Sequence, residues 1–127
     1  MAIYSIVPFS GSTDFRGIKI TTTASPGDTV HTAQASASLP DHVTLQLTNT
    51  DTVDRPYTVQ FGGTTSPDDK LTGYVPAGLT VTVCDKKPIR NNLVVKVASI
   101  SATVLGNALT GAANVLVAHG YVQRQTA

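Results

Sequence analysis

The chain has 127 residues, of which 41% are hydrophobic and 13% are charged, and its nine Lys and Arg nearly balance its eight Asp and Glu. This length suits one domain with a sizeable core. The low charge, with no basic cluster larger than residues 86–90, argues against a nucleic-acid-binding surface. The single cysteine, Cys84, excludes an intrachain disulfide, and no apolar run is long enough for a membrane-spanning helix.

Residues 1–20 differ in character from the rest of the chain. They contain five apolar side chains ahead of a polar stretch at 10–13: Ile3, Tyr4, Ile6, Val7 and Phe9. Apolar residues at a terminus need a covering surface. The segment therefore predicts either an edge strand of the same domain or an arm that docks on a partner. It has no basic region before a long apolar core, so no secretory signal is predicted.

Between residues 21 and 127, apolar and polar residues alternate in short runs, the pattern of strands with one buried face. Turns rich in Pro, Gly, Asn and Asp separate these runs. The spacing predicts an all-β, single-domain antiparallel β-sandwich, either immunoglobulin-like or jelly-roll-like. In chain order the expected strands are 29–33, 43–48, 57–61, 79–83 and 93–97, and the main turns are 25–28, 49–56, 62–69, 76–78 and 88–92.

The last thirty residues contain two different patterns. Residues 98–113 are rich in Ala, Gly, Ser and Asn, and they predict either a short strand pair or a loose loop. Residues 114–124 are apolar on both faces at first and become polar toward the end. This second pattern predicts a central strand that is buried on both sides.

Side chains that carry chemistry are few and scattered. His31, His42 and His119 lack the spacing of metal ligands, although a folded sheet could gather His31, His119 and a carboxylate. The adjacent pair Asp68 and Asp69 predicts a turn cap or a contact with a basic neighbour rather than a cation site. No nucleophile elbow or phosphate loop is present. We therefore predict no catalytic residue, no metal and no cofactor, and a protein that is not an enzyme.

Two segments of the chain are distinctive, Gly-Gly-Thr-Thr-Ser-Pro-Asp-Asp at 62–69 and His-Gly-Tyr-Val-Gln-Arg at 119–124. They resemble segments of the capsid decoration, or cement, proteins of tailed bacteriophages, and the resemblance covers residues 16–124. Further matching segments are 26–33, 43–50 and 92–97. The chain departs from the family pattern in its longer 100–113 stretch and its apolar N-terminus, and these departures leave the mode of docking open.

The resemblance implies a β-sandwich without catalysis, usually a homotrimer. It also implies a place on the outer surface of a phage head, where the major capsid protein is the partner, after synthesis in the host cytoplasm. The expected contacts with other chains combine the N-terminal segment with charged loop residues: Ile3, Tyr4, Ile6, Phe9, Phe15, Arg16, Asp68, Asp69, Arg90 and Arg124.

Two other functions stay open on the sequence alone. The chain could be a head-fibre, tail or receptor-binding module of a virion, with specificity for host glycans in loops 50–56, 62–70 and 85–92. A small β-fold hydrolase is the third possibility, but it needs a convergent polar site that the sequence does not reveal.

Overall fold

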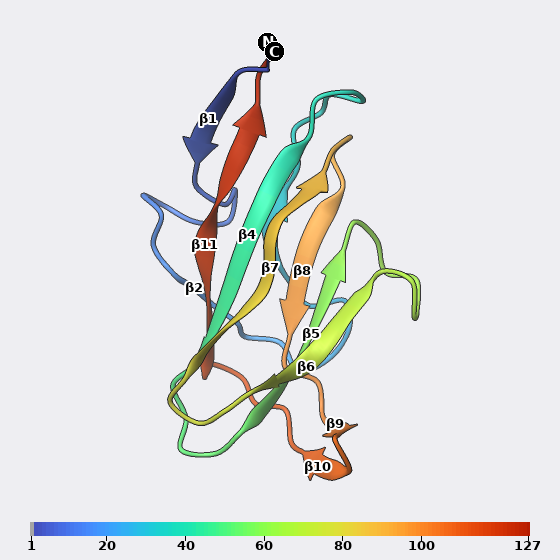
Figure 1. Ribbon diagram of the computed structural model, residues 1–127. Helices are drawn as coiled ribbons and strands as arrows, with labels where there is room; N and C mark the ends of the chain where they lie inside the picture. The colour runs from blue at the N-terminus through green and yellow to red at the C-terminus, as the bar shows by residue number, and fades with distance from the viewer. Residues whose placement is uncertain (1) are drawn as a thin grey trace.

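A computed structural model describes residues 2–127, and these residues form β-strands and no helix (Figure 1). The predicted all-β class is confirmed. No described segment provides a helix that could cross a membrane. The strands are β1 (Tyr4–Val7), β2 (Ile18–Lys19), β3 (Asp28–Thr32), β4 (Asp41–Asn49), β5 (Arg55–Phe61), β6 (Lys70–Val75), β7 (Thr80–Ile89), β8 (Val94–Ala98), β9 (Ala102–Val104), β10 (Asn107–Leu109) and β11 (Leu116–Gln125).

Two antiparallel sheets form the body of the molecule. The first has the order β1-β11-β4-β7, with β2 beside β11, and the second has the order β3-β8-β5-β6. β9 and β10 form a separate two-stranded hairpin, which extends from the lower end in Figure 1. Side chains from both sheets make one shared core, as expected for a β-sandwich.

The strand pairing is nested along the chain. The N-terminal pair β1 and β2 lies against β11, β3 against β8, β4 against β7, and β5 against β6, all antiparallel. This is the pattern of one long hairpin that has been rolled up, with its two halves shared between two sheets. It is the jelly-roll arrangement, one of the two alternatives that the sequence predicted.

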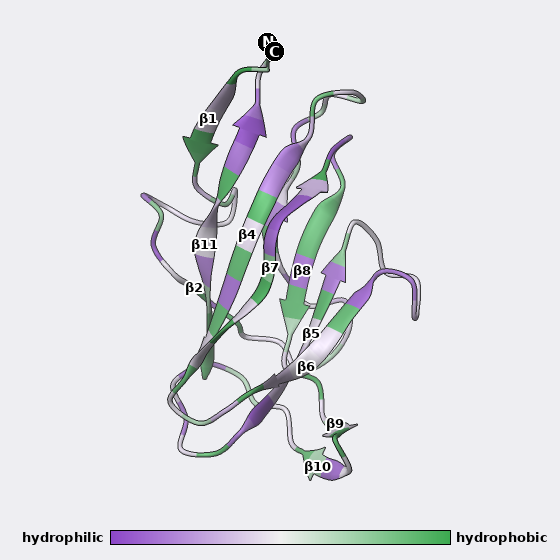
Figure 2. Cartoon of the chain, viewed as in Figure 1, coloured by the Kyte–Doolittle hydropathy of each residue, from purple (hydrophilic) through white to green (hydrophobic). Residues whose placement is uncertain are grey.

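The alternating runs bury the side chains that the sequence pattern assigned to the core. On β4, Val43, Leu45 and Leu47 are fully buried, and hydrophobic and polar positions alternate along the strand in Figure 2. Val95 and Val97 on β8 are buried in the same core. Burial of each such aliphatic side chain contributes about 1.5–3 kcal/mol.

Leu79 is an exception to the expected pattern. We assigned it to the buried face of a strand, but it precedes β7 and is 56% exposed. Its amide donates to the carbonyl of Pro76 at 3.1 Å, so the residue belongs to the turn between β6 and β7. Strand β6 itself was not predicted, because it contains Gly73 and lacks a clear alternation.

The N-terminal segment lies on the sandwich as its edge. β1 pairs with the end of β11, from Tyr4 opposite Gln125 to Val7 opposite Val122, and β2 pairs further down the same strand. The loop between β1 and β2 carries Phe9 into the core, where it is only 2% exposed. Phe9 therefore differs from the expectation that it lies at an outer contact surface, because its ring is covered by the protein itself.

Residues 98–113 contain the short strand pair that was one of their two predicted alternatives. β9 and β10 pair from Ala102 opposite Leu109 to Val104 opposite Asn107. The turn between them has positive φ at both central residues, 52° at Leu105 and 81° at Gly106, as in the turns that suit tight hairpins. β11 lies between β4 on one side and β1 and β2 on the other, so the predicted central position is confirmed. The predicted burial on both sides is wrong, because Leu116, Ala118 and Val122 are buried on one face while His119 on the other face is exposed.

Gly120 occupies a position in β11 that no other residue can fill. Its φ is +143°, and a Cβ would overlap the carbonyl oxygen of Thr44 and lie 3.0 Å from Cζ of Phe9. The missing side chain lets the neighbouring strand and the Phe9 ring approach closely. This requirement explains the glycine in the His-Gly-Tyr-Val-Gln-Arg segment.

Gly120→Ala is expected to destabilise the protein by roughly 3 kcal/mol or more, because the new methyl group overlaps backbone that is held in the sheet. Gly78→Ala is the matched control. Gly78 also has a positive φ, +71°, but has no atom within 4 Å of the added Cβ, so only the backbone strain of about 1–2 kcal/mol remains. Chemical denaturation of both variants measures the difference, and equal losses would contradict the steric explanation.

Candidate interaction surfaces

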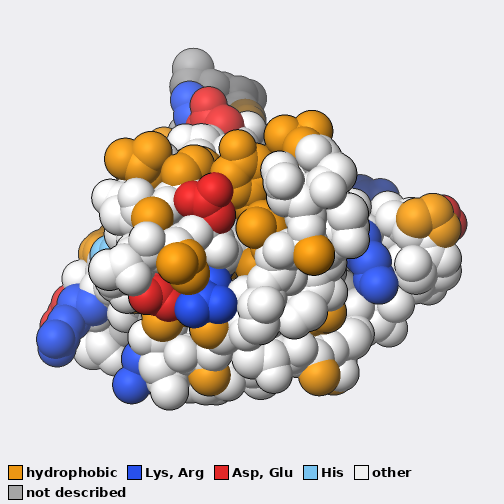
Figure 3. Space-filling view, turned by 90° about the horizontal axis from the view of Figure 1, so that it is seen from below, with side chains coloured by type: hydrophobic (Ala, Val, Ile, Leu, Met, Phe, Trp, Pro, Cys, Tyr) orange, Lys and Arg blue, Asp and Glu red, His pale blue; other side chains and the backbone are white. Residues whose placement is uncertain are grey.

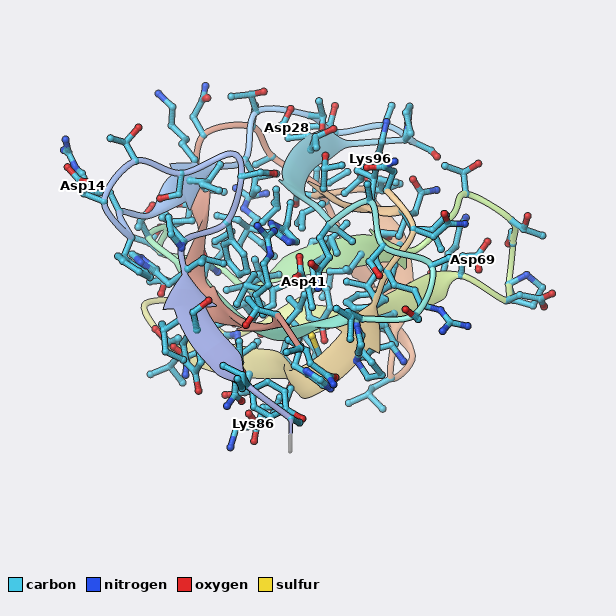
Figure 4. All side chains as sticks on the ribbon, turned by 90° about the horizontal axis from the view of Figure 1, so that it is seen from above. Asp14, Asp28, Asp41, Asp69, Lys86 and Lys96 are labelled. Atoms are coloured by element: carbon cyan, nitrogen blue, oxygen red, sulfur yellow. The ribbon has the colours of Figure 1, made fainter. Side chains whose placement is uncertain are left out.

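A buried carboxylate lies between the two sheets near the end that carries the chain termini. Asp41, at the start of β4, is fully buried and lies centrally when the molecule is seen from above (Figure 4). Arg124 on β11 donates to both of its oxygens, from Nε at 2.8 Å and from a terminal nitrogen at 3.0 Å. The amide of Gln34 donates at 3.2 Å, and Nε2 of His31 lies 2.8 Å from Oδ2.

The surroundings of His31 determine its protonation. The backbone amide of Ser10 donates to Nδ1 at 3.0 Å. Because an amide can only donate, Nδ1 carries no proton, and Nε2 must carry the proton that binds Asp41. His31 is therefore neutral, and protonation of Nδ1 would break its hydrogen bond with Ser10.

These contacts shift the pKa values of both residues. Burial lowers the pKa of His31 below its ordinary value and outweighs the opposing effect of Asp41. Burial alone would raise the pKa of Asp41, but the hydrogen bonds and charge of Arg124, together with the bonds from His31 and Gln34, lower it overall. The cluster is thus a neutral histidine beside a carboxylate–guanidinium pair, with its donors and acceptors matched internally.

Arg124→Met is expected to destabilise the fold by about 3 kcal/mol, because it leaves the Asp41 carboxylate buried without its counter-ion. Arg124 was expected at an outer contact surface, but its guanidinium is turned toward Asp41 and its side chain is only 31% exposed. Arg16→Met is the control, since Arg16 lies exposed in the loop before β2. Thermal and chemical unfolding should show a change within about 0.5 kcal/mol for the control.

Acid should weaken the fold through His31. Its pKa in the folded state lies below 6.5, so the unfolded chain binds a proton there as pH falls, while the folded chain does not. The free energy of unfolding is expected to fall as the pH drops from 7 through 6.5, the ordinary pKa of histidine, and Asp41 adds to the loss below its ordinary pKa of 3.8. Denaturation at several pH values measures this. His31→Gln should flatten the slope, and a slope equal to that of the unmodified protein would contradict the assignment.

The loop between β5 and β6 is organised by Asp69. Its carboxylate accepts a hydrogen bond from the amide of Thr65 at 3.0 Å, and its own amide donates to the carbonyl of Thr65 at 2.9 Å. A Cβ on Gly63 would lie 2.5 Å from Oδ2 of Asp69, so the glycine makes room for this cap. The predicted turn cap is confirmed for Asp69.

A groove of about 470 Å³ brings together three of the expected contact residues, Asp68, Asp69 and Arg90. It lies between the β5–β6 loop and the end of β7, and Phe61, Leu71, Ile89 and Leu93 contribute apolar walls. Nζ of Lys87 lies 5.2 Å from the centre of the Phe61 ring, within the range of a cation–π contact. The groove presents both signs of charge beside apolar surface.

Three exposed aliphatic side chains belong to loops at the opposite end of the sandwich: Val53, Leu79 and Leu105. Leu105, at the tip of the β9–β10 hairpin, is 83% exposed. Hollows of about 270 and 440 Å³ border the hairpin, and Leu109 lines both of them. Figure 3 looks onto this end, where hydrophobic side chains gather around a few charged ones.

Of this end of the sandwich, the sequence predicted only loop 50–56, which contains Val53, as a contact surface, and only for the receptor-binding alternative. Leu79 was assigned to the core, and Leu105 lies in a segment dominated by small residues. The positive φ at Leu105, which places a large side chain outward at a turn, was not visible in the alternation of residue types.

The remaining expected contact residues lie around the N-terminal edge. Ile3, Tyr4 and Ile6 are exposed along β1, and Phe15 and Arg16 are exposed in the loop that follows. They are distant in sequence from the groove residues, and the structure does not place them along the same groove. The ten expected contact residues therefore do not form a single site.

His31 and His119 are separated from one another in the fold. His119 is exposed on β11, whereas His31 is buried beside Asp41, so the gathering of these two histidines that was considered does not occur. Within residues 2–127, no group of three or more His, Cys, Asp or Glu side chains is arranged to hold a metal ion. Burial raises the pKa of the Cys84 thiol, and its Sγ lies 3.6 Å from the carbonyl of Val43.

Comparison with known family models, curated proteins and solved structures found no match for this chain.

Proposed function

We propose that the protein is a non-catalytic structural component of a phage virion that binds the outer surface of the capsid and stabilises it. The observation that carries the proposal is the exposed apolar end formed by Val53, Leu79 and Leu105, which we call the hairpin end. A contiguous exposed apolar patch marks a surface that other proteins cover, and Figure 3 shows hydrophobic side chains gathered at this end. The resemblance to decoration proteins indicates which partner covers this end, namely the outer surface of a phage capsid.

An uncharged region on the outer face of the first sheet supports the same function. There, the hydroxyl groups of Thr48 and Thr80 share a hydrogen bond of 2.7 Å. The side-chain amide nitrogen of Gln46 lies 3.5 Å from the hydroxyl oxygen of Thr82. These side chains carry no charge, so the face neither attracts nor repels the polyanions around a virion. Binding energy is then concentrated at the apolar end.

Attachment in many copies makes a weak individual contact sufficient. A capsid presents the same surface repeatedly, and a linked set of contacts binds far more tightly than one contact alone. A decoration protein built in this way reinforces the shell by burying additional surface between neighbouring capsomers.

Leu105→Asp is expected to weaken binding to capsids at least about 10-fold, because a central apolar anchor that becomes charged typically costs 2 kcal/mol or more. The binding partner in the test is an empty head assembled from the major capsid protein encoded in the same genome. Co-sedimentation measures the bound fraction, and particle survival during heating measures stabilisation. Leu93→Asp is the matched control, because Leu93 is also exposed but lies at the opposite end of the sandwich.

Failure of the unmodified protein to bind these heads would overturn the proposal. The groove that contains Asp68 and Arg90 favours a second candidate, a virion module that binds host glycans, since it combines charged groups with an apolar wall. Binding to host-surface polysaccharide that is lost in Asp68→Asn, without binding to heads, would support this second function.

A further inference from the structure

Strand β1 is an open edge whose free hydrogen-bonding groups can be identified. The amide of Ile3 donates to Ala127, and the carbonyl of Ile3 accepts from Thr126, so the backbone groups of Ile3 point toward β11. The direction alternates along an antiparallel strand, so those of Ser5 and Val7 also point toward β11. The amide of Gln125, opposite Tyr4, donates instead to Pro40 on the far side of β11. The backbone groups of Tyr4 and Ile6 therefore point outward.

Three other edge strands, β7, β3 and β6, carry the features by which proteins prevent strand addition. β7 contains Pro88 with Asp85, Lys86 and Lys87, and its register against β4 shifts twice. β3 has a register shift between Thr29 and His31. β6 begins at Lys70 and contains Gly73, a residue that weakens strands.

β1 has none of these features. Its four residues, Tyr4 to Val7, include no charge and no proline, and their register against β11 is unbroken. Ile3, Tyr4 and Ile6 expose apolar side chains along the strand. A regular, apolar and uncharged edge is a template for another strand.

We propose that two copies of this chain pair through β1, antiparallel, about a two-fold axis at Ser5. Tyr4 of each copy then lies opposite Ile6 of the other, and their outward amides and carbonyls complete hydrogen-bonded pairs. Ser5 lies opposite Ser5 of the second copy. The two first sheets join into one continuous sheet, in which the second copy's β1 lies beside the first.

The sequence of the edge is complementary to itself in this register. The Tyr4–Ile6 pair occurs twice and joins an aromatic ring to a β-branched side chain, a favourable cross-strand combination. Ile3 lies opposite Val7, so a second type of apolar pair also occurs twice. No like charges meet, whereas the same pairing through β7 would bring its lysines together. This match favours a second copy over an unrelated strand.

The pairing has a consequence for the assembly as a whole. Because antiparallel pairing inverts one copy relative to the other, the hairpin ends point in opposite directions. Such a dimer is suited to bridge two neighbouring sites, and it differs from the three-fold association that the resemblance implies. The pairing itself does not depend on the proposed function and is tested without capsids.

The first test is the mass of the purified protein over a range of concentrations, measured by sedimentation and light scattering. The expected species is a dimer. The double variant Tyr4→Lys with Ile6→Lys places positive charges opposite one another and should be monomeric, with the dissociation constant raised at least about 100-fold. The double variant Tyr4→Glu with Ile6→Lys places opposite charges in register and should recover dimerisation.

Leu93→Lys is the matched control, because Leu93 and Tyr4 are both 44% exposed, yet Leu93 lies beside β5 and the end of β7 and not beside β1. Its mass should equal that of the unmodified protein. A monomer at every concentration, or a trimer that the paired lysines leave intact, would overturn the proposal. Circular dichroism checks that each variant is folded.

The second test does not require the variants to change the charge of the edge. In a Cys84→Ser background, Ser5→Cys places two thiols at the axis, where opposite Cα atoms in a non-hydrogen-bonded pair lie about 4.5 Å apart. That separation permits a disulfide, so mild oxidation should yield a covalent dimer. Tyr4→Cys is the control, since its thiol faces Ile6 and should cross-link at least about 10-fold more slowly. Equal rates for the two variants would show that the register is wrong.

Discussion

The closure of this sandwich depends on the hydrogen bonds and the ion pair that the buried Asp41 carboxylate makes. It joins β4 and β11 in one sheet to His31 on β3 in the other, and His31 in turn accepts a hydrogen bond from the loop that follows β1. Four segments from distant parts of the chain thus meet at one buried charge. A buried carboxylate is tolerated only when it is matched by donors, so the cluster selects the arrangement that supplies them all.

An apolar contact beside this cluster closes the same region of the fold. Phe9 enters the core from the loop after β1. Its ring lies close to Gly120, where a side chain on residue 120 would crowd it. The ring centres of Phe9 and His31 are 6.0 Å apart. Because Phe9 and Ser10 are adjacent, one residue anchors the loop by burial and the next by a hydrogen bond to His31.

The two segments that most resemble decoration proteins have structural explanations in this chain. Asp69 and Gly63 build the turn between β5 and β6, while Gly120 and Arg124 provide the close approach and the ion pair inside the sandwich. These residues stabilise the sandwich. Their presence in the chain is therefore evidence for the fold rather than for a particular binding partner. The proposed function therefore rests on the exposed hairpin end, and the proposed dimer rests on the open edge of β1.

The sequence by itself determined the all-β class, the five principal alternating strands and the central position of β11, because strand periodicity and turn residues are local properties of the chain. It also predicted that the Asp68–Asp69 pair forms a turn cap or contacts a basic neighbour, and the structure assigns the cap to Asp69. Tertiary structure decided which residues meet across long separations: Asp41 pairs with Arg124 across 83 positions, and Phe9 is buried although its neighbours Ile3 and Ile6 are exposed. Only the order of the strands decides these outcomes, since burial and pairing depend on which segments become neighbours.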